Sequence, residues 1–164
     1  MNRRYTTAEY EEKVKMLREA FPFVSITTDV IVGFPGETQE EFMETKAFLE
    51  KVSFYEMHIF KYSRRKGTKA DLMENQIPEQ IKTERSNILL ELGEKMSSEY
   101  RSSYFGKKVS VLFEEEKTID SKRYWVGHTP EYVTVAYMSE EDEANEIKEL
   151  TLCDFLNADI CLGK

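Results

Sequence analysis

The spacing of apolar residues predicts an amphipathic helix near the start of the chain. Between residues 7 and 20, apolar positions recur three and four residues apart, which is the period of one face of a helix. We expect that face to carry Tyr10, Val14, Leu17 and Phe21. Thr6 and Glu9 have the spacing of a capping box, which predicts where the helix begins, and Pro22 ends it.

A β-branched segment over residues 25–32 predicts the first strand. Its continuous apolar end favours burial on both faces, as in a parallel sheet. A tight loop over residues 33–37 follows, and Thr38 with Glu41 predicts a second capped helix. The core-facing residues of that helix are expected to be Phe42, Thr45, Phe48, Leu49 and Val52. Because residues 55–60 predict another strand, the segment forms a βαβ unit with a right-handed crossover.

The rest of the chain predicts one long helix and then a set of short strands. Residues 62–77 form a polar loop, and Pro78 suits the first position of a helix that continues to about Tyr100. Its apolar stripe would consist of Ile81, Ile88, Leu89, Leu92 and Met96. Strands are expected near residues 108–114, 123–128, 131–137, 147–153 and 158–162, which favours a small antiparallel barrel. We interpret the acidic residues 139–146 as a solvated loop.

The chain therefore divides into an α/β part over residues 1–99 and an all-β part over residues 100–164. Two parallel strands do not form an independently stable sheet, and a parallel sheet needs cover on both faces. We interpret the α/β part as a portion of a larger sheet, and the chain as the C-terminal portion of a longer protein. The open sheet edge gives a route to self-association.

Composition and charge exclude several classes of protein. Hydrophobic residues make up 40% of the 164 residues and charged residues 33%, so the chain can bury a core and is not wholly disordered. No apolar run reaches the ~20 residues that a membrane span needs, and no secretory signal is present. We therefore expect a cytoplasmic protein with no membrane partner. The net charge of −8 does not by itself indicate a nucleic-acid-binding protein.

The chain has too few cysteines for a metal centre of its own. Cys153 and Cys161 are the only two, which excludes a four-cysteine zinc site or iron–sulfur cluster within one chain. His58 and His128 are far apart in sequence and have no neighbouring ligands at metal-binding spacing. No catalytic triad or pair of carboxylates stands out, so we assign no catalytic residue.

The segment from Val32 to Glu37 is the first candidate binding site. It joins a predicted strand to a capped helix, and such loops lie at the carboxyl end of a parallel sheet, where ligands bind. Gly33 and Gly36 allow a flat ligand to approach the backbone, whose N–H groups can bind a purine edge or an anion. The same residues also fit a tight turn that binds nothing. Neither a Walker loop nor a GxGxxG motif is present.

A basic segment is the second candidate site. Residues 61–69 follow the second predicted strand, so they would open at the same edge of the sheet. Their positive charges suit contacts with phosphates and come from Lys61, Arg64, Arg65, Lys66 and Lys69. Arg3 and Arg4 could extend this patch. The alternative is an ordinary solvated charged surface.

Two further sets of residues have both a functional and a structural interpretation. His58 lies within the second predicted strand and either faces a substrate inside a barrel or makes structural hydrogen bonds. Tyr124, Trp125 and Tyr132 could stack on bases, but packing in the barrel core is the interpretation that we favour.

Three segments resemble the radical S-adenosylmethionine methylthiotransferases in sequence, order and spacing: residues 1–6, 27–38 and 60–68. The second of these contains the sequence GFPGET. The tail from about Tyr100, including residues 105–109 and 111–115, resembles the TRAM domain of that family, a small OB-like barrel. His58 and the two residues after it look most similar to the enzymes that modify threonylcarbamoyladenosine at position 37 of tRNA. The isopentenyladenosine-tRNA and ribosomal-protein enzymes are close relatives.

The resemblance implies the last part of a radical SAM (β/α) barrel, then the TRAM barrel, and methylthiolation of tRNA. In the family, a [4Fe–4S] cluster on a CxxxCxxC motif cleaves S-adenosylmethionine, and a second cluster takes part in sulfur insertion. The residues implied at the S-adenosylmethionine site are Val32, Gly33, Phe34, Pro35, Gly36 and Glu37. The residues expected to contact the tRNA anticodon loop are Arg3, Arg4, Lys61, Arg64, Arg65, Lys66 and Lys69.

The chain departs from the family pattern in two respects. It has no CxxxCxxC motif, so we expect it to be inactive by itself. Residues 101–164 carry 8 Lys+Arg against 13 Asp+Glu, a net charge of −5, which weakens RNA binding by the barrel. An acidic barrel would suit a basic ribosomal protein as substrate, and a non-enzymatic module that binds RNA or a protein is a further alternative.

Overall fold

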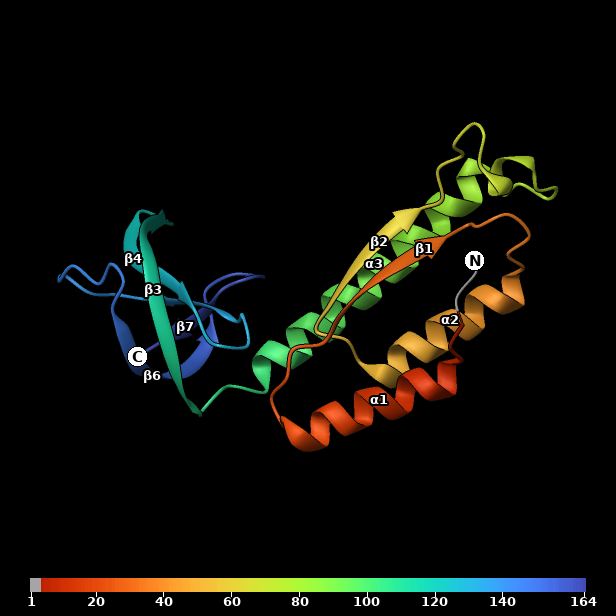
Figure 1. The fold of residues 1–164 in the computed structure, drawn as a ribbon. Coiled ribbons are helices and arrows are strands. Elements are labelled where there is room, and N and C mark those ends of the chain that lie inside the picture. Colours follow the sequence, from red (N-terminus) through yellow and green to blue (C-terminus); the bar gives the residue numbers. More distant parts are fainter. Residues whose placement is uncertain (1–3) are drawn as a thin grey trace. The chain divides into compact units, whose positions relative to one another are not determined.

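The computed structural model describes residues 4–164 and forms two compact units, Met1–Ser97 and Ser98–Lys164. The first unit contains, in chain order, α1 (Thr7–Ala20), β1 (Thr27–Val32), α2 (Gln39–Val52), β2 (Glu56–Lys61), the short 3₁₀ helix η1 (Lys69–Leu72) and most of α3 (Glu79–Ser102) (Figure 1). None of the helices that the structure describes is long and apolar enough to cross a membrane.

The first unit is built on a two-stranded parallel sheet. β1 and β2 pair in register from Thr27 opposite Glu56 to Val32 opposite Lys61. One face of the sheet packs against all three helices in a single core, whose buried members are Val14, Val30, Val32, Phe42, Leu49, Val52, Phe54, Leu89, Leu92 and Met96.

The other face of this sheet is exposed, contrary to the burial on both faces that the sequence predicted. Ile31 is exposed on β1, and its neighbour Phe60 on β2 is 52% exposed. The side chains of Asp29 and His58, in register with each other, are exposed on the same face. The physical reason is that α1, α2 and α3 all contribute to one core on the opposite face.

Both predicted capping boxes are present and fix the starts of α1 and α2. Thr6 and Glu9 exchange the two expected hydrogen bonds, and Thr38 and Glu41 do the same. Each interaction satisfies backbone N–H groups that a helix start leaves without partners.

The predicted apolar faces of the helices are only partly buried. In α1, Val14 is buried, but Leu17 and Phe21 are exposed, so only part of the predicted apolar face packs in the core. The helix packs through its Tyr10 side, with ring contacts to Phe48 and Phe54, and this contact is narrower than the apolar stripe. The predicted core residues of α2 are buried or half-buried.

The same difference occurs in α3. Its predicted apolar stripe splits into a buried part, which is Leu89, Leu92 and Met96, and an exposed part, which is Ile81 and Ile88. Periodicity therefore identified the helix correctly but overestimated the width of the face that packs.

The second unit is a closed five-stranded barrel, and the prediction of a small β-barrel is confirmed. Its strands are β3 (Lys108–Ile119), β4 (Lys122–His128), β5 (Thr134–Tyr137), β6 (Ile147–Phe155) and β7 (Cys161–Gly163), in the order β3-β4-β5-β7-β6 (Figure 1). One pairing differs from the prediction, because β5 and β7 run parallel rather than antiparallel. β5 also begins three residues later than predicted, after a turn.

Aromatic and branched residues fill the barrel. The buried core includes Tyr104, Val111, Phe113, Trp125, Val133, Val135, Leu150, Leu152 and Cys161. Tyr124 and Trp125 are buried, as the packing interpretation expected, whereas Tyr132 is 74% exposed. Gly127 is required where β4 pairs with β3, because an added Cβ would lie 2.0 Å from the carbonyl oxygen of Leu112.

The acidic segment 139–146 is not fully solvated, contrary to the prediction. Glu143 is 1% exposed and anchors the segment to the barrel. Its carboxylate accepts hydrogen bonds from Lys148 Nζ at 2.5 Å and from Ser139 Oγ at 2.6 Å. The hydrogen bond from Lys148 is the main reason why the pKa of Glu143 lies below its usual value.

Candidate functional site

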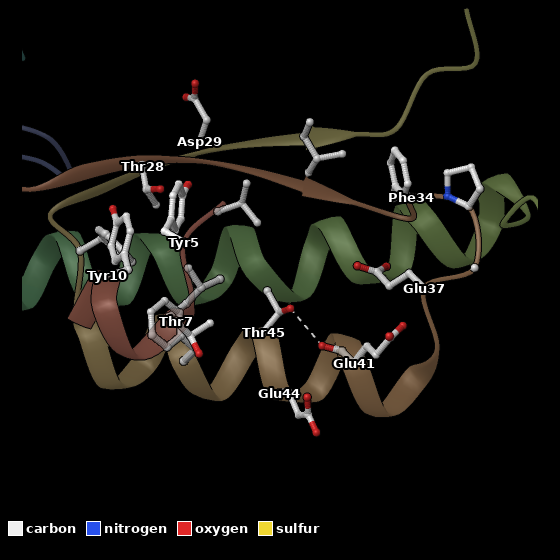
Figure 2. A pocket seen from close by; sticks show the side chains of 17 residues that line it. Tyr5, Thr7, Tyr10, Thr28, Asp29, Phe34, Glu37, Glu41, Glu44 and Thr45 are labelled. Atoms are coloured by element: carbon white, nitrogen blue, oxygen red, sulfur yellow. Dashed lines mark hydrogen bonds between the residues drawn. The ribbon is translucent and has the colours of Figure 1, made fainter. Parts of the chain in front are cut away.

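The loop after β1 lines a cavity of about 790 Å³ in the first unit (Figure 2). Four of the six predicted cofactor residues line it, namely Phe34, Pro35, Gly36 and Glu37. Residues of α1 and the segment before it, of β1 and of α2, together with Phe54, form the rest of the wall. Figure 2 shows Asp29 pointing away from α2, whereas Glu41 and Thr45 extend from α2 itself.

The two glycines of this loop have different roles. Both adopt a left-handed backbone, with φ of +71° at Gly33 and +87° at Gly36. An added Cβ at Gly33 would lie 2.3 Å from Lys82 Cγ, so the packing of α3 fills the space beside it. Around Gly36 the same Cβ would meet nothing within 4 Å. Gly36 is therefore the point at which a ligand can approach the backbone closely.

A buried arginine on α3 holds the loop through Glu37. Arg85 is 5% exposed, and its Nη1 donates to Glu37 Oε2 at 2.5 Å and to the Glu37 carbonyl oxygen at 3.1 Å. The same carboxylate oxygen accepts from the backbone N–H of Gly33 at 2.7 Å. The Glu37 carboxylate therefore accepts hydrogen bonds from the Arg85 side chain and from the Gly33 backbone.

Sequence reasoning did not identify Arg85. The available signal is weak: Arg85 is a charged residue four positions before Leu89, which belongs to the buried stripe of α3. Its guanidinium carbon lies 5.3 Å from the centre of the Phe42 ring, which adds a cation–π contact. A charge in this position is retained only when its partner is supplied by another part of the fold.

The loops that follow β1 and β2 are joined to each other and to α3. Tyr62 donates its backbone N–H to the carbonyl oxygen of Val32 at 2.8 Å, and its ring meets Phe34 edge-on at 5.3 Å. Lys82 Nζ on α3 donates to the Tyr62 carbonyl oxygen at 3.0 Å. The two candidate segments, residues 32–37 and 61–69, therefore lie together at the carboxyl ends of β1 and β2.

The structure divides the basic segment into paired and unpaired side chains. Arg64 donates to the Asp71 carboxylate at 2.6 Å and to its carbonyl oxygen at 2.7 Å, and Lys61 pairs with Glu79 at 2.6 Å. These hydrogen bonds hold the pKa values of Asp71 and Glu79 below their usual range.

Within the described residues, no acidic side chain pairs with the three remaining cations of the segment, Arg65, Lys66 and Lys69, and all three are exposed. Arg4 is exposed ahead of α1, and Arg3 lies outside the residues described. Phosphate contacts need cations that are free to bind, and Arg65, Lys66 and Lys69 meet this requirement.

No metal centre is formed by residues 4–164: no group of three or more His, Cys, Asp or Glu side chains is placed to hold a metal ion. Cys161 is buried in the barrel, and its desolvation raises the pKa of the thiol to about 11. Cys153 donates its thiol to the carbonyl oxygen of Leu162 at 3.3 Å. The two cysteines do not fit the thiolate ligands of an iron–sulfur cluster.

An α/β unit with a glycine-containing βα loop, followed by a closed five-stranded barrel, is the architecture of this protein. No family model matches the chain. Comparison with curated proteins nevertheless finds relatives along most of its length. The chain is 39% identical over 153 residues to the threonylcarbamoyladenosine tRNA methylthiotransferase MtaB of Bacillus subtilis (strain 168), covering 93% of this chain and 34% of that protein.

Two further relatives are also named as enzymes that methylthiolate tRNA. The MtaB protein of Aquifex aeolicus (strain VF5) is 45% identical over 124 residues, which is 76% of this chain and 30% of that protein. The tRNA-2-methylthio-N(6)-dimethylallyladenosine synthase of Acetivibrio thermocellus is 47% identical over 114 residues, or 70% of this chain and 24% of that protein. The chain thus spans about a quarter to a third of the length of these relatives.

The chain belongs to the methylthiotransferase family, which confirms the resemblance of its sequence to that family.

Proposed function

We propose that this chain is the C-terminal part of a radical SAM tRNA methylthiotransferase that modifies N6-threonylcarbamoyladenosine at position 37. The observation that carries the proposal is the match to the MtaB protein of Bacillus subtilis over 93% of the chain. This match spans both the α/β unit with its GFPGET loop and the barrel.

Within this proposal, residues 1–99 are the last part of a (β/α) barrel and residues 100–164 are an OB-like TRAM domain. The parallel βαβ topology of β1, α2 and β2 supports the first assignment, and the closed five-stranded barrel supports the second. The setting that suits tRNA modification is the cytoplasm.

The S-adenosylmethionine site of the proposed enzyme lies against the loop after β1. In the family this cofactor, bound beside an iron–sulfur cluster, supplies a radical. The surroundings of Gly36 fit a flat ligand, since nothing within 4 Å would meet a Cβ there, and Phe34 and Pro35 line the same cavity. Val32 and Gly33 are buried and support the loop from behind.

The cluster ligands are not among the residues described, so we propose that this chain is inactive by itself. Its part in the reaction is to shape one wall of the cofactor site and to bind RNA.

The tRNA anticodon loop is the proposed partner of the basic segment. Arg65, Lys66 and Lys69 are the cations that can bind phosphates, while Lys61 and Arg64 brace the segment through Glu79 and Asp71. This segment follows β2 and contacts the loop after β1 through Tyr62, so RNA bound there would lie near the proposed cofactor site.

A chimeric enzyme tests the proposal. The part of the Bacillus subtilis MtaB protein that precedes the matched region is joined to this chain and expressed in bacteria that lack their own methylthiotransferases. Mass spectrometry of tRNA nucleosides should detect methylthiolated threonylcarbamoyladenosine. The chain expressed without the MtaB part should give no methylthiolated nucleoside. Activity of the chain alone, or no product from a folded chimera that carries its clusters, would refute the proposal.

The same experiment distinguishes a second candidate substrate. Over 70% of its length, the chain is 47% identical to a tRNA-2-methylthio-N(6)-dimethylallyladenosine synthase, and this favours N6-dimethylallyladenosine as the alternative substrate. Methylthiolated dimethylallyladenosine, with unmodified threonylcarbamoyladenosine, would assign the chain to that type.

A further inference from the structure

Three of the four exposed large hydrophobic residues of the barrel unit line one pocket. Four large hydrophobic side chains are exposed in residues 98–164: Leu112, Tyr132, Met138 and Ile147. All except Met138 line one pocket of about 300 Å³. Leu112 on β3 is in register with His128 on β4 and with Ile147 on β6, so the strand pairing itself brings these residues together. Scattered exposed apolar residues are ordinary, but a cluster around a pocket marks an interaction site.

Tyr132 is held in this pocket at the expense of backbone strain. Its φ is +67°, a left-handed conformation that is unusual for a bulky side chain, and its side chain is 74% exposed. The turn is fixed by Thr129, whose carbonyl oxygen accepts from Tyr132 N at 2.9 Å and whose Oγ1 accepts from Val133 N at 3.2 Å. Strain at an exposed residue that does not pack in the core points to a function for that residue.

A carboxylate and a second ring complete the pocket. Glu114 Oε2 lies 2.6 Å from Nδ1 of His128, and the His128 ring is centred 5.3 Å from the Tyr132 ring. Glu114 remains half-exposed and has a second oxygen that can accept hydrogen bonds. An aromatic face, a carboxylate and the apolar side chains of Leu112 and Ile147 are complementary to a guanidinium group on an aliphatic stem.

The negative charge of the barrel favours a positively charged polypeptide over a nucleic acid as the partner of this pocket. Residues 101–164 carry 8 Lys+Arg against 13 Asp+Glu, a net charge of −5. Glu131 precedes Tyr132 in the turn, and Glu149 on β6 is in register with Ser110, which lines the pocket. The cation next to Ile147, Lys148, is already paired with Glu143. Such surroundings repel phosphates and attract positively charged groups.

We propose that this pocket binds an arginine-bearing, positively charged polypeptide segment, with the guanidinium stacked on Tyr132 and paired with Glu114. The proposal concerns a surface of the barrel and is independent of the tRNA contacts assigned to the basic segment.

Replacing Tyr132 by asparagine tests the proposal on the complete 164-residue chain. The probe is a fluorescent peptide of alternating arginine and glycine residues, and its affinity is measured by anisotropy. Tyr132→Asn should weaken binding about tenfold, as expected for loss of a cation–π contact. The same variant should raise the melting temperature, because asparagine tolerates the left-handed backbone. Loss of binding in a more stable protein separates recognition from folding.

Matched variants and probes complete the test. Met138→Ala removes the exposed hydrophobic residue outside the pocket and should leave peptide affinity unchanged, whereas Glu114→Gln should weaken it. A lysine–glycine peptide should bind more weakly than the arginine peptide, because lysine cannot stack and pair in the same way. Equal peptide affinity of the wild type and Tyr132→Asn would overturn the proposal. The proposal would also be overturned if Tyr132→Asn lost affinity for a single-stranded RNA oligonucleotide while it kept its affinity for the arginine peptide.

Discussion

At the scale of single residues, Arg85 controls the loop that borders the proposed cofactor site. Its Nη1 and the Gly33 N–H both donate to one oxygen of Glu37, and both charged side chains are largely buried. We expect Arg85→Met to lower the free energy of unfolding of the first unit by about 3 kcal/mol, since it leaves a buried carboxylate without its partner. Urea titration measures this change, and hydrogen exchange of the Gly33 amide should become faster.

Arg18 provides a matched control for Arg85. It also donates two hydrogen bonds, at 2.6 Å to the carbonyl oxygens of Val52 and Ser53, but among residues 4–164 it pairs with no carboxylate. Arg18→Met should cost about 1 kcal/mol and leave the Gly33 amide protected. Equal effects of the two substitutions would show that Arg85 has no special role in the loop.

The basic segment gives a second prediction at this scale. The double substitution Arg65→Ala with Lys66→Ala should reduce the slope of log affinity for tRNA against log salt concentration by about 1.5, which corresponds to two phosphate contacts. Arg64→Ala should change that slope little, because Arg64 already pairs with Asp71. Filter-binding titrations from low to moderate salt measure both slopes. A larger change for Arg64 than for the double variant would contradict the assignment.

Because the pKa of Glu143 is lowered in the folded barrel, we expect the stability of the barrel to depend on pH. Its pKa is below the ordinary value of 4.5, chiefly because of the hydrogen bond from Lys148, so the unfolded chain binds this proton more readily than the folded chain. The stabilisation is therefore present above pH 4.5 and is lost as the pH falls through the folded-state pKa. Glu143→Gln should lower the melting temperature at pH 7, and the difference from the wild type should shrink at pH 3. A constant difference across this range would exclude the ion pair as its cause.

At the scale of secondary-structure elements, alternation along β3 decides which side chains matter for stability. Phe113 is fully buried in the barrel, whereas its neighbour Leu112 points outward and is exposed. Phe113→Ala should lower the free energy of unfolding of the barrel by about 3–5 kcal/mol, and Leu112→Ala by no more than about 0.5 kcal/mol. Thermal and urea unfolding measure both. Similar losses for the two would mean that β3 has a different register.

The elements themselves were largely predictable from the sequence. Capping boxes placed the starts of α1 and α2 correctly, because they depend on residues only three positions apart. The exposed positions of Leu17 and Phe21 were not predictable, since apolar spacing shows that a face exists but not how much of it a neighbour covers.

At the scale of the whole molecule, the two units differ in completeness. The barrel closes on itself, so each of its strands has two partners. In the first unit, β1 pairs only with β2 among the residues described, and three helices cover one face of the sheet. The sequence had predicted an incomplete sheet from the presence of only two parallel strands. We propose that its open edge is a route to association with another chain.

The sequence by itself determined the order of helices and strands, the glycine loop at the end of β1 and the family, because these depend on local spacing and on contiguous motifs. Only the tertiary structure decided which charged residues are available. It paired Arg64 with Asp71 and, among the described residues, left the Arg65 side chain without an acidic partner. It also brought Arg85 to Glu37 across 48 positions of sequence. The physical reason is that ion pairs and burial depend on distances in space, which spacing along the chain does not fix.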